Sequence, residues 1–81
     1  MKVTIYTRTT CAYCVQVKKL LEMKGQEYSV INLDEDKAAE TYILEKSGMR
    51  NVPIVTVTRD NTEEEVVSVG WNPAALLKAI A

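Results

Sequence analysis

Strand-like and helix-like stretches alternate along the whole chain, and this alternation restricts the fold more than any other feature. Residues 2–7 and 28–33 are rich in β-branched residues and Tyr, which is typical of strands. Between them, apolar residues recur at helical spacing up to Lys24, and Gly25 ends the pattern. A strand–helix–strand unit of this kind predicts parallel pairing through a right-handed crossover.

A second helix and a hairpin are expected in the following part of the chain. The acidic residues 34–36 favour a helix N-terminus by their charge, and the helix that follows them ends at Gly48. Residues 54–58 and 65–69 are strand-like and flank a polar turn at residues 59–62, which predicts a hairpin.

The sequence ends in a short predicted helix. Asn72 is a suitable N-cap, and residues 73–80 follow it with a proline in the first helical position. The predicted order is therefore β-α-β-α-β-β-α in a single domain over residues 1–81. Strands separated by helices are expected to pair in parallel and the last two strands antiparallel. The result is an α/β fold with a four-stranded mixed sheet and three helices.

The composition excludes several classes of protein. Of the 81 residues 47% are hydrophobic, which is typical of a globular domain. The net charge is −1 and no basic cluster stands out, so no nucleic-acid partner is expected. No apolar run approaches the roughly 18 residues that cross a bilayer, and the N-terminus lacks signal-peptide features, so we expect a cytoplasmic protein with no membrane partner. The acidic run at residues 63–65 is expected to form a solvated turn.

The two cysteines, Cys11 and Cys14, stand where the first strand gives way to the first helix. Thr9 and Thr10 offer that helix an N-cap, which places Cys11 at its start and Cys14 one turn further on the same face. Unpaired N–H groups and the helix dipole stabilise a thiolate at a helix N-terminus. The pattern therefore predicts an exposed nucleophile at Cys11 and a resolving thiol at Cys14.

Other interpretations of the cysteine pair predict different proteins. Two cysteines at helical spacing also occur as small buried core residues. A zinc site requires about four ligands, and the chain supplies only this pair and no histidine, although two chains together can share a metal. A structural disulfide is disfavoured, because so short a loop constrains the unfolded chain very little.

Nearly the whole chain resembles the glutaredoxin family. Residues 5–14 (Ile-Tyr-Thr-Arg-Thr-Thr-Cys-Ala-Tyr-Cys) and 51–53 (Asn-Val-Pro) are similar to the segments of that family that contain Cys-Pro-Tyr-Cys and Thr-Val-Pro. Ala12 replaces the first proline, and Asn51 replaces the threonine. The resemblance implies a thioredoxin fold in which Pro53 is cis and faces the cysteine pair.

The resemblance also implies a substrate groove around the cysteines. Tyr13, Val52 and Pro53 would line this groove, and the backbone of Val52 would pair with an extended disulfide substrate by strand addition. Arg8 stands where many glutaredoxins carry a Lys that contacts a glutathione carboxylate, a contact that a bidentate guanidinium also makes. The alternative for Arg8 is a solvated loop charge.

The C-terminal part departs from the family pattern. Glutathione-binding members commonly have Gly-Gly followed by an acidic segment, whereas residues 69–73 are Val-Gly-Trp-Asn-Pro, so that only Gly70 remains. This segment is more similar to the Gly-Phe-x-Pro stretch of NrdH-redoxins, which take electrons from thioredoxin reductase and pass them to ribonucleotide reductase. Trp71 is expected either to dock a partner near the groove or to anchor the last helix in the core, and the second role is favoured.

We therefore expect a monomeric thiol–disulfide oxidoreductase that reduces protein or glutathione mixed disulfides through Cys11 and Cys14 without a bound cofactor. Its reductant would be glutathione or thioredoxin reductase, and ribonucleotide reductase is one expected target. The rival hypotheses are an iron–sulfur carrier in which two chains bridge a cluster through Cys11, and a copper-chaperone-like module. The β-α-β-β-α-β order of copper chaperones argues against the last.

Overall fold

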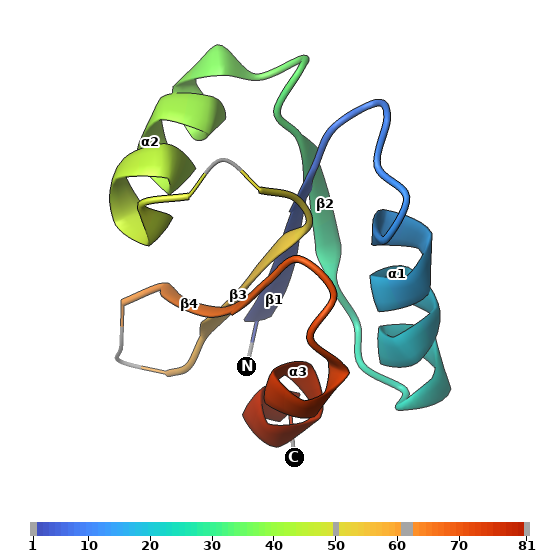
Figure 1. Cartoon of the computed structure of the whole chain (residues 1–81). Coiled ribbons are helices and arrows are strands. Elements are labelled where there is room, and N and C mark those ends of the chain that lie inside the picture. The colour runs from blue at the N-terminus through green and yellow to red at the C-terminus, as the bar shows by residue number, and fades with distance from the viewer. Residues whose placement is uncertain (1, 50, 61–62, 81) are drawn as a thin grey trace.

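The computed structural model describes residues 2–49, 51–60 and 63–80, which form three helices and four strands (Figure 1). The elements follow the predicted order β-α-β-α-β-β-α, which confirms the thioredoxin-like fold and does not fit a copper-chaperone-like module. They are β1 (Lys2–Thr7), α1 (Cys14–Met23), β2 (Ser29–Asn32), α2 (Lys37–Ser47), β3 (Ile54–Thr58), β4 (Glu65–Val69) and α3 (Pro73–Ile80).

The strands form one mixed sheet in the order β2-β1-β3-β4. β1 is parallel to β2 and β4 is antiparallel to β3, as predicted. β3, however, is antiparallel to β1, so the expectation of parallel pairing is wrong for this strand. Ile54 at the start of β3 lies opposite Tyr6 near the end of β1. The chain thus enters β3 at the same end of the sheet where it left β2, and α2 does not act as a crossover to the opposite end.

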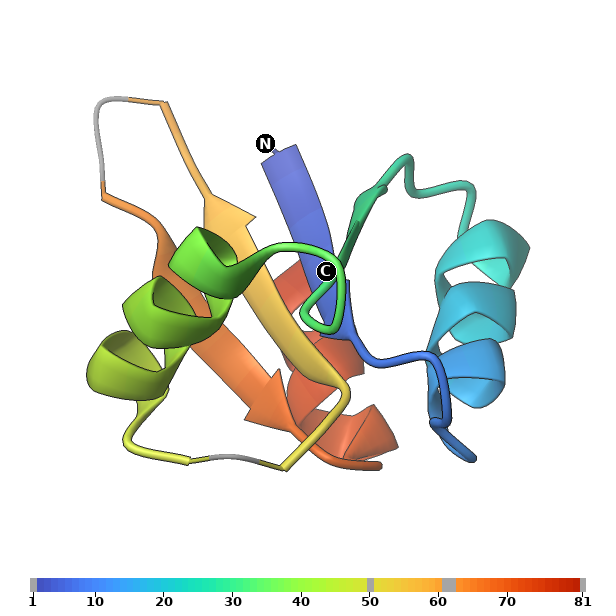
Figure 2. The same cartoon turned by 90° about the horizontal axis from the view of Figure 1, so that it is seen from above.

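Helices cover both faces of the sheet, with α1 and α3 on one face and α2 on the other (Figure 2). Successive side chains of a strand point to opposite faces, and each face has its own buried core. The core under α1 and α3 contains Val3, Ile5, Val17, Leu21, Val55, Val57 and Leu76. The core under α2 contains Tyr6, Leu33, Ile43 and Ile54. Because both faces are covered, the inner strands are fixed in position and so are the loops that leave their ends.

Side chains cap the second and third helices at the predicted places. The Asp36 carboxylate accepts the Ala39 N–H at 3.0 Å before α2, and the Asn72 side-chain oxygen accepts the Ala75 N–H at 3.2 Å before α3. Gly48 ends α2 with a φ of 70°, a left-handed conformation that glycine adopts without a steric cost. The boundaries of these two helices were therefore encoded locally.

The first helix begins later than its sequence predicted. Tyr13 occupies the N-cap position of α1 without a side-chain hydrogen bond, so the expectation of a Thr9 or Thr10 cap is wrong. Thr9 has other partners, because its N–H is donated to Asp34 and its hydroxyl accepts a bond from Asn32. Cys14 is consequently the first residue of α1 and lies at the start of the helix rather than one turn inside it.

A half-buried carboxylate, Glu64, ties the hairpin to the rest of the fold. It accepts hydrogen bonds from the Tyr6 hydroxyl at 2.6 Å, the Tyr42 hydroxyl at 2.7 Å and the Thr56 hydroxyl. The expectation that the acidic run forms a solvated turn is therefore wrong for this residue. The pairing of β3 with β4 confirms the hairpin, although positions 61 and 62 of its predicted turn lie outside the described residues.

These hydroxyls change the titration of the Glu64 cluster. Burial raises the pKa of Glu64, but the donors Thr56, Tyr42 and Tyr6 outweigh burial and leave this pKa below its ordinary value. The same contact raises the pKa of Tyr42 to about 12.

No helix in the described part of the chain is long and apolar enough to span a membrane.

We expect Glu64→Gln to lower the free energy of unfolding by about 1–3 kcal/mol at pH 7, because hydrogen bonds to a charged acceptor are lost. Since the folded pKa is depressed, this stabilisation is present above the ordinary pKa of glutamate and is lost as the pH falls through the lower folded value. Urea titrations at pH 7 and at pH 3 measure both effects. Glu63→Gln, one position away and exposed, is the control, and an equal loss in both variants contradicts the assigned role.

Candidate active site

Three strand registers bring distant segments of the chain to one end of the sheet. Thr7 at the end of β1 lies opposite Asn32 at the end of β2. Ile54 lies between Tyr6 of β1 and Val69 at the end of β4. The loops that follow β1, β2 and β4 and the loop that precedes β3 therefore all meet here. These loops, together with the first residue of α1, carry every residue that the sequence nominated for the site.

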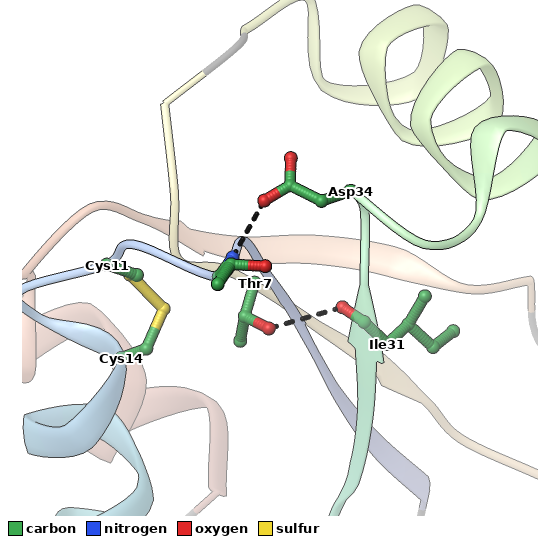
Figure 3. The surroundings of a disulfide bond; sticks show 6 residues. Thr7, Cys11, Cys14, Ile31 and Asp34 are labelled. Carbon is green, nitrogen blue, oxygen red and sulfur yellow. Dashed lines mark hydrogen bonds between the residues drawn. A yellow bond between two sulfur atoms is a disulfide. The ribbon is translucent and has the colours of Figure 1, made fainter.

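Cys11 and Cys14 form a disulfide, with the sulfur atoms 2.06 Å apart and the Cα atoms 5.5 Å apart (Figure 3). Cys14 is 4% exposed at the start of α1, whereas Cys11 in the preceding loop is half-buried. An attacking thiolate can therefore approach Cys11 more readily than Cys14. The two sulfur atoms are bonded to each other, so the pair is not two separate core residues.

The start of α1 suits a sulfur anion. Within the described residues 2–49, the first turn of α1 contains no acidic residue and the N-cap residue Tyr13 offers no side-chain acceptor. Backbone N–H groups at such a helix end are unpaired by the helix and favour negative charge.

The loop before β3 is joined to the end of β4. The Val52–Pro53 peptide bond is cis, which confirms what the family resemblance implied. Pro53 is buried and Val52 half-buried. The Pro53 carbonyl accepts the Gly70 N–H at 2.8 Å. Gly70 has a φ of 71°, a value that other residues adopt only with strain, so a glycine suits the turn that follows β4.

An aromatic pair covers the surface beside the disulfide. The rings of Tyr13 and Trp71 stack with centroids 6.4 Å apart and planes inclined by 6°. Tyr13 is 51% exposed and Trp71 is 40% exposed. The favoured expectation that Trp71 anchors α3 in the core is therefore wrong, because the core position of this helix is taken by Leu76, which is 1% exposed.

Arg8 is paired with two carboxylates of the segment that follows β2. Its Nη1 donates to an Asp34 oxygen at 2.9 Å and its Nη2 to a Glu40 oxygen at 2.6 Å. The hydrogen bond with Glu40, followed by that with Asp34, raises the pKa of Arg8. The residue is therefore not a solvated loop charge, and both of its terminal nitrogens already have carboxylate partners.

Asp34 and Asn32 fasten the loop that leads to the disulfide. The sequence pattern did not indicate that they belong to the site. One Asp34 oxygen accepts the Thr9 N–H at 2.8 Å, and this bond lowers the pKa of Asp34 more than Arg8 does. The Asn32 amide donates to the Thr9 hydroxyl at 3.4 Å, and its oxygen accepts the Asp34 N–H at 2.9 Å. Their position at the end of β2, beside the end of β1, was the available signal.

Comparison with known proteins identifies the family. Residues 3–61 match the glutaredoxin family model. The glutaredoxin-like protein NrdH of Escherichia coli is 39% identical over 56 residues, which cover 68% of this chain and 67% of NrdH. The N-acetyl-S-hydroxy-L-cysteine reductase of Bacillus subtilis is 27% identical over 70 residues, 86% of this chain and 75% of that enzyme.

The solved structures agree in fold over almost the full length. NrdH-redoxin of Escherichia coli superposes with a TM-score of 0.74 at 29% identity, covering 96% of this chain and 93% of the other. The family match includes both cysteines and the cis-proline, and the agreement in fold extends past the match to α3. We conclude that the chain belongs to the glutaredoxin family and is a thiol–disulfide oxidoreductase.

Proposed function

We propose that this protein is a dithiol electron carrier that reduces disulfides of partner proteins and is reduced in turn by a flavin enzyme of the thioredoxin reductase type. The observation that carries the proposal is the exposed aromatic stack of Tyr13 and Trp71 beside the disulfide. The proposed setting is the cytoplasm, where reduced thiols persist. No cofactor is bound in this cycle.

The reaction is a pair of exchanges. The Cys11 thiolate attacks one sulfur of the substrate disulfide, which forms a mixed disulfide and releases the other substrate sulfur as a thiolate. The Cys14 thiolate then attacks the Cys11 sulfur, which closes the Cys11–Cys14 disulfide and releases the second substrate thiolate. The substrate gains two electrons, and the carrier loses them. The greater exposure of Cys11 supports its role as the first nucleophile, and the burial of Cys14 supports its role as the resolving thiol.

The surface around Cys11 suits a protein partner. Trp and Tyr are enriched among the residues that carry binding energy in interfaces, since they cover a large area with few rotatable bonds. Tyr13 lies between the two cysteines, so a partner that contacts the stack is held next to the reacting sulfur. The half-buried Val52, ahead of the cis-proline, is positioned to pair its backbone with an extended partner segment.

The proposed choice of reductant rests on the ion pairs of Arg8 and on the similarity to NrdH-redoxin. Arg8, which a glutathione carboxylate would need, is already paired with Asp34 and Glu40. NrdH-redoxin of Escherichia coli is a glutaredoxin-like protein with a thioredoxin-like activity profile, and this chain shares its fold. A ribonucleotide reductase is accordingly one proposed target, and glutathione is proposed to be the weaker reductant.

We expect NADPH oxidation in the presence of the oxidised protein to be at least about tenfold faster with bacterial thioredoxin reductase than with glutathione and glutathione reductase. Each arm contains the same concentration of the protein and of NADPH, and absorbance at the NADPH band gives the rate. Faster turnover in the glutathione arm contradicts the proposed donor and leaves the family assignment intact.

The two cysteines are expected to respond differently to substitution. Cys11→Ser removes the first nucleophile and abolishes disulfide reduction, whereas Cys14→Ser retains formation of a mixed disulfide but loses its intramolecular release. Disulfide reduction and mass spectrometry of the trapped adduct measure the two steps. Full activity of Cys11→Ser overturns the mechanism.

Trp71→Ala is expected to raise the KM for thioredoxin reductase about five- to thirtyfold, because an interfacial aromatic side chain contributes on the order of 1–2 kcal/mol. Met23→Ala is the matched control, since Met23 is an exposed apolar residue at the other end of α1. A KM that is equal for Trp71→Ala and the unmodified protein shows that the aromatic stack is not a docking surface.

A further inference from the structure

The ion cluster of Arg8, Asp34 and Glu40 adjoins the reactive loop but takes no part in the exchange steps. The three side chains are 28%, 41% and 31% exposed, so the cluster is half open to solvent. Lys37 approaches the other Glu40 oxygen at 3.9 Å and is 78% exposed, which makes its contribution small. The two contacts of Arg8 are shorter and use separate nitrogens, so its positive charge faces two negative ones.

This cluster is close to the nucleophile along the chain. Arg8 and Cys11 are three positions apart in the sequence. A fully extended chain separates their Cα atoms by at most about 11 Å. The screening length in physiological salt is about 8 Å, and it is longer in dilute buffer. In dilute buffer, where the screening length exceeds this separation, an unpaired cation at position 8 would attract anions toward Cys11, and the paired carboxylates oppose that attraction.

The structure also holds this arrangement in place. Asp34 receives the Thr9 N–H with one oxygen and Arg8 with the other. Asn32 in turn accepts the Asp34 N–H. Among the described residues, the hydrogen bonds that fasten the loop between β1 and Cys11 involve Arg8 and Thr9, so the cluster is joined directly to this loop.

We propose that Asp34 and Glu40 are specificity-determining residues, which pair with Arg8 and thereby withdraw a positive charge from the approach to Cys11. The substrates disfavoured by this pairing are small anionic thiols and disulfides, a class that includes glutathione with its two carboxylates and one ammonium group. Uncharged segments of protein disulfides are unaffected. The inference deepens the proposed function, since it assumes that Cys11 is the nucleophile, but it involves neither reductase.

Two alkylating reagents of nearly equal size test this directly. Iodoacetate carries one negative charge and iodoacetamide carries none, and with each the Cys11 thiolate forms a sulfur–carbon bond and releases iodide. The ratio of the two rate constants on the reduced protein cancels differences in thiolate fraction. It therefore reports the charge that a reagent meets on its way to the sulfur.

The double variant Asp34→Asn/Glu40→Gln is expected to raise the iodoacetate-to-iodoacetamide ratio on the order of threefold at low ionic strength, and much less in 1 M salt. Asparagine at position 34 retains an oxygen for the Thr9 N–H, so the charge is removed while the loop contact is kept. Arg8→Gln is expected to change the ratio in the opposite direction, because the two carboxylates then lack their guanidinium.

The matched control is Glu35→Gln/Glu45→Gln. It also removes two negative charges, but from side chains that make no contact with Arg8 in the described structure. Circular dichroism shows whether each variant is folded, and the single variant Glu40→Gln replaces the double one if that does not fold. An unchanged ratio in the Asp34 and Glu40 variants, or an equal rise in the control, overturns the inference. Rapid alkylation that persists in Cys11→Ser instead contradicts the proposed nucleophile.

Discussion

The pairing of β1 with a parallel neighbour on one side and an antiparallel neighbour on the other determines where all the chemistry lies. A parallel neighbour ends where β1 ends, and an antiparallel neighbour begins there. The loop with Cys11 therefore meets the loop after β2 and the cis-proline before β3. The antiparallel hairpin then returns β4 to the same end, so that Gly70 and Trp71 complete the site. No single segment of the chain contains this site.

Polar contacts between loops complement the apolar cores. The cores fix the strands, but the loops beyond them depend on a few hydrogen bonds, such as Gly70 N–H to the Pro53 carbonyl and Thr9 N–H to Asp34. Each of these bonds joins segments that are distant in sequence. The Cys11 sulfur can thus be accessible for exchange while the backbone that carries it is held in position, which is the condition for a fast and repeatable reaction.

The local pattern of the sequence was sufficient for the elements and for the cysteine pair. The caps at Asp36 and Asn72 and the C-terminal Gly48 are each recognised by groups within four positions, so they were predictable from neighbouring residues. The cis state of Pro53 was implied by the family resemblance and not by the pattern. For the cysteines, the transition from strand to helix located the site, although the true start of α1 depended on what Thr9 contacts.

Other features required the register of distant strands. Arg8 pairs with residues 26 and 32 positions away, and Tyr6 pairs with Glu64 at a separation of 58. Nothing near Arg8 or Glu64 in the sequence indicates these partners. Glu64 was therefore expected to be solvated, and Arg8 either to contact a glutathione carboxylate or to be solvated. The direction of β3 was missed for the same reason, because the path of α2 depends on packing over the sheet. The exposure of Trp71 likewise follows from Leu76 filling the core under α3.

In the proposed cycle, electrons enter through Cys11 from a flavin reductase that docks on the surface around Tyr13 and Trp71. The most direct measurement starts from the Cys14→Ser protein, in which dithiobis(nitrobenzoate) converts Cys11 to a mixed disulfide with thionitrobenzoate. A thioredoxin reductase variant that keeps one redox thiol then displaces the thionitrobenzoate and forms the intermolecular disulfide. Peptide mapping by mass spectrometry then locates the intermolecular disulfide. We expect a stable adduct through Cys11, with a lower yield in the Trp71→Ala variant. The absence of an adduct, or an adduct whose yield is unaffected by that substitution, contradicts it.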